Sequence, residues 1–373
     1  MEYVQESVAT LHDFGRGRRS TAGVTPDAPT AEATVVVPMT ARECGSTAAT
    51  GVLRALSSLD LDSVLVALHA DPERAGPVAS WLDGFDCDPD VLWCNAPAVE
   101  RLLSDSGLAG DAGKGRDVWL ALGVAAARSE YVVVHDADAR SYTRAHVPKL
   151  LFPVARGYDF AKGYYARVEN DRLYGRLCRL LFDPLVRTLS AAHDAPVLEY
   201  LSSFRYALAG EFAATSDLIR RLRVQRGWGL EVGTLGDAFE AAGASGTAQV
   251  DLGFHRHDHR SVDGDGGLGD MAEQVTAALF RVVEDAGVQP DYATLPTRYR
   301  DVATQLVEQY ATDAAFNGLD YDAGDERRQV ATYADAVVPP GSDTRLPAWD
   351  DAPLAATAVG DHAATSLAAR PER

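Results

Sequence analysis

Short runs of apolar residues recur through the first half of the chain, and stretches with helical periodicity separate them. Residues 46–59 and 117–128 place apolar side chains every three or four positions, as amphipathic helices do. The apolar runs have the length and β-branched content of buried strands. They are A33-T-V-V-V-P38, S63-V-L-V-A-L-H69, D90-V-L-W-C94 and Y131-V-V-V134. Strands that alternate with helices predict an α/β fold with a Rossmann-like, mostly parallel sheet flanked by helices.

The later part of the chain changes character near residue 266. Before it, short strands at 158–163 and 247–252 are mixed with helical stretches, and after it helical periodicity dominates in a C-terminal extension. We expect an irregular N-terminal arm, two halves of the sheet domain, the helical extension and a disordered tail. The bounds of these five parts are 1–32, 33–170, 171–265, 266–338 and 339–373.

The composition excludes several classes of partner. Asp and Glu number 54 against 35 Lys and Arg, a formal net charge of −19, and such a chain repels nucleic acid and anionic lipid. No apolar run approaches the ~18 residues of a membrane span, and the acidic N-terminus lacks the order of a signal peptide. We expect a cytoplasmic protein with no nucleic-acid and no membrane partner.

Lysine is scarce in this chain, because only three of the 35 basic residues are Lys. Together with the acidic surplus, this is typical of a halophile, whose salt-rich cytoplasm screens the self-repulsion. A GC-rich genome produces the same exchange of Lys for Arg. Since Arg is the default cation here, Lys114, Lys149 and Lys162 are candidates for specific roles.

Asp136 and Asp138 directly follow the predicted strand 131–134. In an extended segment, side chains two residues apart point the same way, so both carboxylates can bind one cation. Mg²⁺ or Mn²⁺ takes one or two carboxylates and leaves positions for phosphate oxygens. A polar turn with an aspartate cap is the alternative. The position at the carboxyl end of a strand, where α/β sheets bind ligands, favours a metal site.

Three further motifs carry chemistry. G113-K-G115 precedes a helix, and glycines with a lysine at a helix N-terminus suit an anion, although a flexible loop has the same pattern. H255-R-H257-D-H259 follows the strand 247–252, so one histidine is a candidate third metal ligand or part of a solvated loop. Glu231 lies in the apolar G227-W-G-L-E-V-G233, where it pairs with an Arg or holds a substrate hydroxyl.

The order of these motifs resembles the glucosyl-3-phosphoglycerate synthase family, whose members are retaining glycosyltransferases with the glycosyltransferase A-type fold. The resemblance covers residues 33–285. It rests on Pro38, G113-K-G, H-D136-A-D138, K162-G-Y-Y, G175-R-L with D183-P-L, A209-G-E-F, G227-W-G-L-E-V-G and L252-G-F-H-R-H257. It implies transfer of glucose from UDP-glucose to the 2-hydroxyl of 3-phosphoglycerate, with Mg²⁺ or Mn²⁺, in compatible-solute synthesis by a homodimer.

The resemblance also assigns residues to the substrates, with the donor in the first half of the sheet domain and the acceptor in the second. It makes Asp138 and His257 the metal ligands, with Asp136 beside them. It implies donor contacts from Pro38, Glu43, Lys114, Asp136, Asp138 and Glu231, and acceptor contacts from Gly175, Arg176, Cys178, Gly210 and Glu211. Asp138, Glu231 and Arg176 would be catalytic. The leaving diphosphate can accept the proton of the acceptor hydroxyl, so no separate general base is required.

Departures from the family pattern keep the substrates open. L68-H-A-D-P-E73 replaces a D-S-G-S-type stretch that helps to hold the nucleoside, and Cys178 replaces a hydroxyl residue. GDP-mannose as donor and glycerate as acceptor are therefore alternatives. Two other enzyme classes pair carboxylates in this way, the polyprenyl-phosphate sugar transferases and the sugar-phosphate nucleotidyltransferases. The first is expected to have membrane-directed segments and the second a glycine-rich loop after its first strand. A non-enzymatic binding module would need no metal.

Overall fold

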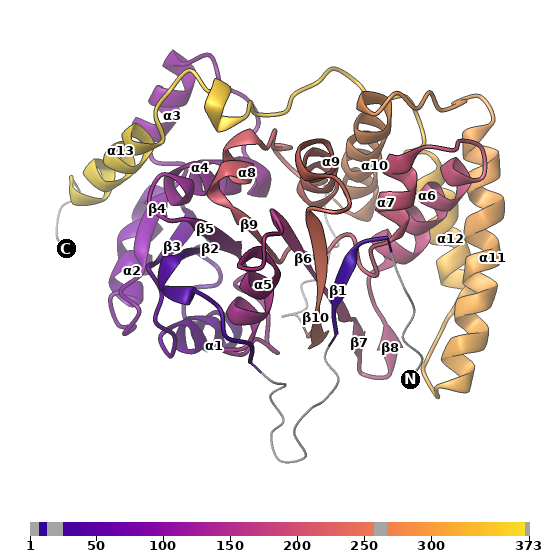
Figure 1. The fold of residues 1–373 in the computed structure, drawn as a ribbon, viewed down its shortest axis with the longest axis horizontal. Coiled ribbons are helices and arrows are strands. Elements are labelled where there is room, and N and C mark those ends of the chain that lie inside the picture. The colour runs from indigo at the N-terminus through magenta and orange to yellow at the C-terminus, as the bar shows by residue number, and fades with distance from the viewer. Residues whose placement is uncertain (1–6, 13–24, 257–266, 370–373) are drawn as a thin grey trace.

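The computed structural model describes residues 7–12, 25–256 and 267–369. One sheet runs through the middle of the molecule (Figure 1). Its strands are β1 (Ala9–Leu11), β2 (Ala33–Thr40), β3 (Ser63–His69), β4 (Asp90–Trp93), β5 (Tyr131–Val134), β6 (Phe160–Ala166), β9 (Phe212–Thr215) and β10 (Thr247–Phe254). Their order is β1-β10-β6-β9-β5-β2-β3-β4. β9 runs antiparallel to both of its neighbours, and the other pairings are parallel, which confirms a mostly parallel sheet.

Helices flank this sheet and continue into the C-terminal part of the chain (Figure 1). They are α1 (Thr47–Leu56), α2 (Pro72–Leu82), α3 (Pro97–Asp105), α4 (Lys114–Ala126), α5 (His146–Val154), α6 (Asp183–Ser190), α7 (Pro196–Ser202), α8 (Ser216–Arg221), α9 (Leu230–Ala242), α10 (Leu268–Asp285), α11 (Leu295–Phe316), α12 (Ala323–Ala334) and α13 (Ala356–Ala368). A π-helix, η2 (Leu177–Phe182), leads into α6, and β7 (Val168–Glu169) pairs with β8 (Arg172–Leu173). None of the helices in the described ranges is long and apolar enough to cross a membrane.

The strand β2 continues past Pro38, where the sequence pattern predicted its end. Proline lacks an N–H and is normally excluded from the middle of a sheet. Here β5 ends first: it pairs with β2 only as far as Val36, whose carbonyl accepts the N–H of His135. The nitrogen of Pro38 therefore faces a side of β2 where no ladder partner follows, while β3 pairs with the other side as far as Thr40. The proline costs no hydrogen bond of the sheet.

The strand directions bring several distant segments to one edge of the sheet. In a parallel sheet the loops after the strands lie at the carboxyl edge, and a helix that precedes a strand begins there. The N-termini of α4 and α9 therefore lie at the edge where β2, β3 and β5 end. Because β9 runs in the opposite direction between β5 and β6, the residues just before it, 209–211, reach the same edge. This strand reversal was not visible in the hydrophobic pattern.

The helical extension is built into the main core. The helical extension predicted over 266–338 is present as α10, α11 and α12. Tyr299 of α11 donates its hydroxyl to the carbonyl of Leu180 at 2.6 Å, and Gln274 of α10 accepts the N–H of Trp228 at 2.9 Å. One hydrophobic core includes residues of the sheet and of these helices. The extension therefore lies against the segments that carry the predicted acceptor and donor residues.

The described residues near both chain ends form regular structure that their composition did not predict. The residues before the domain are not irregular throughout, because β1 pairs with β10. The expected disordered tail is wrong for residues 339–369: α13 lies beside α3 and α4 in Figure 1, at the opposite end of the molecule from α11. Trp349 stacks on Trp119 with ring centroids 4.1 Å apart, above Gly123, where a Cβ would lie 2.1 Å from the Trp349 ring. Two indole rings supply the apolar burial that the Ala-rich tail lacks.

Candidate functional site

Asp136 and Asp138 lie just beyond the end of β5. The strand stops at Val134 and residues 137–138 form a turn, so the extended geometry assumed from the sequence does not hold for Asp138. The two aspartates are nevertheless both half-buried, while Ala137 between them is buried, as the extended arrangement would also give. Both charges also act on the same ammonium group, that of Lys114. The two aspartates therefore belong to one electrostatic site.

Lys114 is the first residue of α4 and points its ammonium group at this pair. Its Nζ lies 2.7 Å from Oδ1 of Asp136 and 3.7 Å from Oε1 of Glu231, which is in the first turn of α9. Burial by itself lowers the pKa of Lys114, but the carboxylates of Asp136 and Glu231 outweigh it and raise the pKa above the ordinary value. The sequence predicted either an Arg partner or a substrate hydroxyl for Glu231, and the cation beside it is a lysine rather than an Arg.

The glycines on either side of Lys114 have a packing role that the sequence did not reveal. They were expected to admit a ligand, whereas the nearest atoms belong to residues 225–227. A Cβ on Gly115 would lie 1.8 Å from the carbonyl oxygen of Gln225, and one on Gly113 would lie 2.7 Å from that of Arg226. The N–H of Arg116 also bonds the Arg226 carbonyl at 3.0 Å. The start of α4 is thus fixed against the segment that leads to Glu231.

Lys162 and Glu211 form the buried side of the same site. Lys162 of β6 is 1% exposed, and its Nζ donates to the carbonyl of Ala209 at 2.5 Å. Burial lowers the pKa of Lys162 to about 8, with Glu231 and Glu211 opposing the shift. Glu211 is 2% exposed, and burial followed by the charge of Asp136 raises its pKa to about 7. Lys162 was singled out by lysine scarcity, but the sequence assigned it no role.

The carboxylates of this cluster suit a divalent cation. The ammonium groups of Lys114 and Lys162 lie among four of them, those of Asp136, Asp138, Glu211 and Glu231. When all six groups are ionised, the cluster has two more negative than positive charges. Gly210 lies against Asp136, where a Cβ would be 2.7 Å from Oδ2. Within residues 7–12, 25–256 and 267–369, no three His, Cys, Asp or Glu side chains are arranged to hold a metal. Two carboxylates with oxygen ligands from a substrate are what Mg²⁺ commonly accepts.

His257, the predicted further ligand, lies outside the described residues. The described chain reaches Arg256, whose carbonyl accepts the N–H of Arg140 at 2.8 Å, two residues after Asp138. The N–H of Arg256 bonds the hydroxyl of Ser141 at 3.0 Å. His255, one of the three candidate histidines, is buried and stacks on Tyr165 with ring centroids 4.0 Å apart. The segment that leads to His257 is therefore hydrogen-bonded to the loop that carries the aspartates.

The ends of β2 and β3 form an adjoining polar edge. Glu43 is buried, and its Oε2 accepts the N–H and the hydroxyl of Thr40 at 2.6 and 2.7 Å. Thr40 is the register partner of His69, whose Nδ1 lies 2.8 Å from Oδ2 of Asp117. This hydrogen bond raises the pKa of His69, although burial opposes it. The resemblance placed Glu43 and Pro38 at the donor site, and the strand pattern ended at His69, but the contact between His69 and Asp117 was not predicted.

Three of the predicted acceptor residues, Gly175, Arg176 and Cys178, lie around the start of η2, whereas Gly210 and Glu211 belong to the cluster near Asp136. Gly175 has a φ of +78°, and a Cβ there would lie 2.9 Å from the hydroxyl of Tyr206, so glycine is required. Arg176 is bonded to Asp325 and to Glu326 (3.2 Å), both in the first turn of α12. The side chains of Arg176 and Asp325 are 33% and 39% exposed, whereas that of Glu326 is 5% exposed.

Glu326 and Cys178 are held inside the protein beneath Arg176. Arg179 bonds Glu326 with two nitrogens, at 2.9 and 3.1 Å, which fixes α12 to η2. The Cys178 thiol is buried and donates to Asp183 at 3.7 Å, so it presents no group to a ligand at the surface. Burial raises the pKa of Asp183 to about 6 against the opposing charges of Arg187 and Arg179. The π-helix geometry of η2 is common at functional sites.

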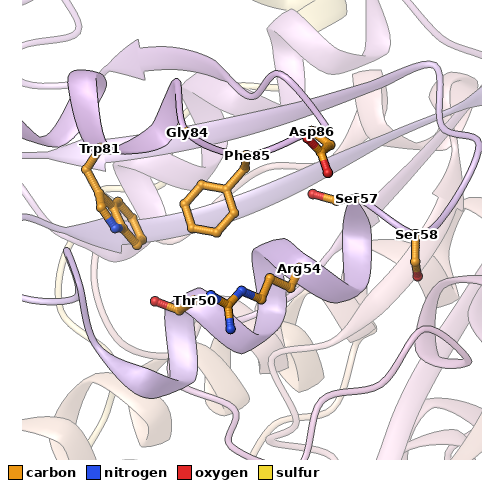
Figure 2. A pocket seen from close by; sticks show the side chains of 8 residues that line it. All are labelled: Thr50, Arg54, Ser57, Ser58, Trp81, Gly84, Phe85 and Asp86. Atoms are coloured by element: carbon orange, nitrogen blue, oxygen red, sulfur yellow. The ribbon is translucent and has the colours of Figure 1, made fainter.

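A separate cavity of about 500 Å³ lies between α1 and the loop after α2 (Figure 2). Trp81 and Phe85 meet edge to face on one side, with ring centroids 5.1 Å apart, and Arg54 lies on the other. The cavity is formed by the C-terminal ends of α1 and α2, and these ends lie at the amino edge of the sheet because each helix returns from a strand. It contains none of the predicted site residues.

Comparison with known proteins gives a consistent result. No protein-family profile matches the chain. A glucosyl-3-phosphoglycerate synthase of Methanococcoides burtonii is 32% identical over 367 residues, which span 92% of this chain and 90% of that protein. One of Persephonella marina is 34% identical over 290 residues, spanning 74% and 72%.

Solved structures of the Mycobacterium tuberculosis glucosyl-3-phosphoglycerate synthase are also similar. The complex with Mn²⁺, UDP-glucose and phosphoglyceric acid has a TM-score of 0.57 at 23% identity, over 77% of this chain and 90% of that one. The complex with Mn²⁺, UDP and phosphoglyceric acid has a TM-score of 0.53 at 26% identity, over 69% and 80%. The extent and identity of these matches show that this chain belongs to the glucosyl-3-phosphoglycerate synthase family and is a glycosyltransferase with that family's fold.

Proposed function

We propose that the protein transfers glucose from UDP-glucose to the 2-hydroxyl of 3-phosphoglycerate, with Mg²⁺ or Mn²⁺ and with retention of configuration. The observation that carries the proposal is the cluster at the carboxyl edge, in which Lys114 joins Asp136 to Glu231. The relatives from Methanococcoides and Persephonella bear the name of this activity, and the mycobacterial complexes contain its donor, metal and a phosphoglyceric acid acceptor. The salt-rich setting and the homodimer remain predictions.

Each part of the donor site has a proposed task. Asp136, Asp138 and His257 would hold the divalent cation, which neutralises the charge of a diphosphate leaving group when bound. Lys114 would turn from Asp136 to a phosphate oxygen of the donor. Glu231, half-buried beside Lys114, would accept hydrogen bonds from glucose hydroxyls. Pro38 and Glu43 would border the base, with the Glu43 carboxylate held in place by Thr40.

The acceptor would bind at the start of η2. Gly175 and Arg176 would hold its phosphate or carboxylate, because guanidinium groups bind such anions with paired hydrogen bonds. The bond between the glucose C1 and the diphosphate oxygen breaks, and C1 forms a bond to the acceptor oxygen. The proton of that hydroxyl passes to the leaving diphosphate, so the protein residues orient and stabilise rather than exchange protons. Gly210 and Glu211 would line the floor between the two substrates.

A matrix of donors and acceptors tests the proposal. UDP- and GDP-linked glucose and mannose are each assayed with 3-phosphoglycerate and with glycerate, in high salt with Mg²⁺ or Mn²⁺. We expect UDP-glucose with 3-phosphoglycerate to give the largest kcat/KM, by at least about tenfold. Faster transfer from GDP-mannose, or to glycerate, would overturn the substrate assignment. The comparison of UDP with GDP donors is the most informative part of the matrix. His69 belongs to the stretch that departs from the family's nucleoside-holding pattern, and it is hydrogen-bonded to Asp117 at the proposed base-binding edge.

The metal assignment has its own control within the same assay. Asp138→Ala should abolish transfer in excess Mg²⁺, because one carboxylate then remains to hold the cation. Asp83→Ala removes an exposed aspartate at the C-terminal end of α2, and it should keep the same metal dependence. Activity retained in Asp138→Ala would contradict the metal site.

A further inference from the structure

Lys162 occupies a costly position that the proposed donor contacts do not explain. An ammonium group loses its hydration when it is buried, and it is kept only where partners compensate. Lys162 is 1% exposed, and within the described residues its hydrogen bond goes to the carbonyl of Ala209 at 2.5 Å. Glu211 and Glu231 are close enough to affect it electrostatically. A chain that uses Arg almost everywhere keeps a lysine here.

The carbonyl that Lys162 holds belongs to a loop in contact with Asp136. Gly210 follows Ala209, and it packs so closely that a Cβ would lie 2.7 Å from Oδ2 of Asp136. The far side of the loop is fixed as well, because the carbonyl of Glu211 accepts the N–H of Gly163 at 2.9 Å. Lys162 and Gly163 of β6 are thus hydrogen-bonded to the loop, and Gly210 of the loop packs against Asp136.

We propose that Lys162 is a positioning residue for the metal-diphosphate site, acting through the Ala209–Glu211 loop to hold Asp136 in its ligating position. This inference rests on the proposed function, since it assigns Asp136 to a metal. Without the ammonium group the Ala209 carbonyl loses its hydrogen bond, and the loop can shift against Asp136. Groups that orient a metal ligand from outside the ligand set are typically worth 10- to 100-fold in metal affinity.

The test measures Mn²⁺-dependent binding of UDP by titration calorimetry, which needs neither acceptor nor turnover. Lys162→Met should raise the half-saturating Mn²⁺ concentration by about tenfold or more, while weak UDP binding without metal changes less than about twofold. If the Lys162→Met protein does not fold, Lys162→Gln is the second variant, because it keeps a polar group in the site. Gly210→Ala should also weaken Mn²⁺ binding, because its methyl group pushes directly on Asp136.

Lys149→Met is the matched control. Lys149 of α5 is also buried and donates to a backbone carbonyl, that of Asp251 at 3.2 Å, so the same chemical change is made outside the loop. It should leave the Mn²⁺ requirement within about twofold of the parent protein. Unchanged Mn²⁺ dependence in a folded Lys162 variant would overturn the proposal, as would an equal loss in Lys149→Met. A failed donor matrix with intact Mn²⁺–UDP binding would instead reject the proposed acceptor or sugar.

Discussion

Lys114 and Arg176 are both cations beside a glycine, yet the structure pairs them with carboxylates of different origin. Lys114 binds Asp136 and Glu231, which come from the strand and helix ends of the same sheet edge. Arg176 binds Asp325 and Glu326, which come from α12, about 150 residues along the chain. The donor-side cation is therefore part of the sheet site itself, whereas the acceptor-side cation is shared with the C-terminal extension.

The difference bears on how each cation would meet its substrate. At the donor side, the carboxylates beside Lys114 are themselves proposed ligands of metal and sugar, so substrate binding redistributes bonds within one cluster. At the proposed acceptor side, an incoming anion would compete with Asp325 for Arg176. Glu326 is fixed by Arg179 and is nearly inaccessible, so the exposed Asp325 is the group that can yield. If Arg176 binds the acceptor as proposed, the extension would affect acceptor affinity through Asp325.

The largest expected effect is on the donor side. Lys114→Met leaves the half-buried carboxylates of Asp136 and Glu231 without their cation and removes a donor from the diphosphate. Loss of one such preorganised group typically costs 10²–10³ in rate. We therefore expect kcat/KM for the donor to fall by at least about 100-fold in steady-state assays, with Lys149→Met close to the parent. A loss below threefold would remove Lys114 from the site.

The next effect separates the two sides. Arg176→Ala should raise KM for the acceptor by tens of fold, because a charged hydrogen bond is worth about 1.5–3 kcal/mol, while KM for the donor stays within about threefold. Arg172→Ala provides the control, since it removes a nearby exposed arginine whose partner Asp320 is 4.0 Å away. Equal changes in the two Michaelis constants would contradict an acceptor role for Arg176.

A stability measurement probes the interior beneath Arg176. Burial raises the pKa of Asp183 to about 6, so the folded protein binds a proton there more tightly than the unfolded chain does. Stability from this group is present below the unfolded pKa of about 4 and is lost as pH rises toward 6. Asp183→Asn should therefore flatten the fall in Tm between pH 4 and pH 6, removing a penalty on the order of 3 kcal/mol at pH 7. An unchanged slope would mean that Asp183 titrates normally.

The smallest expected effect is the reciprocal of the Arg176 experiment. Asp325→Asn removes the exposed carboxylate that competes for Arg176, so KM for the acceptor should fall by about two- to fivefold. The size follows from the modest strength of exposed ion pairs. Asp320→Asn, an exposed aspartate near the same helix, should leave KM unchanged. A rise in KM would show that Asp325 helps to bind the acceptor rather than competing with it.

Local sequence patterns came closer for the cluster around Lys114. The strand 131–134 and the helix that begins near Lys114 were predicted from periodicity, and Glu231 was placed in an apolar, glycine-rich stretch. An alternation of strands and helices then places their ends at one edge, because right-handed crossovers leave little choice of topology. The resemblance to a known family added the order of motifs. Asp136, Lys114 and Glu231 could therefore be grouped before any contact was known.

The acceptor side could not be predicted in the same way. Arg176 was identified, but its partners were not, because nothing in the local pattern near residue 325 indicates which cation α12 will meet. Cys178 was expected at the acceptor, whereas the register of η2 turns its thiol inward to Asp183. The predicted disorder of the tail failed for a related reason. Its low apolar content was read locally, although Trp349 finds its partner at Trp119, 230 residues earlier.

The sequence by itself determined the approximate positions of the strands and helices and the chemistry of the groups at one sheet edge, since each depends on side-chain periodicity over ten or fewer residues. The tertiary structure decided which of those groups touch. It reversed β9, so that Ala209, Gly210 and Glu211 reach Asp136 and Lys162, and it brought α12 onto Arg176. Such contacts depend on the path of the whole chain, because their energies are gained only after distant segments have been brought together.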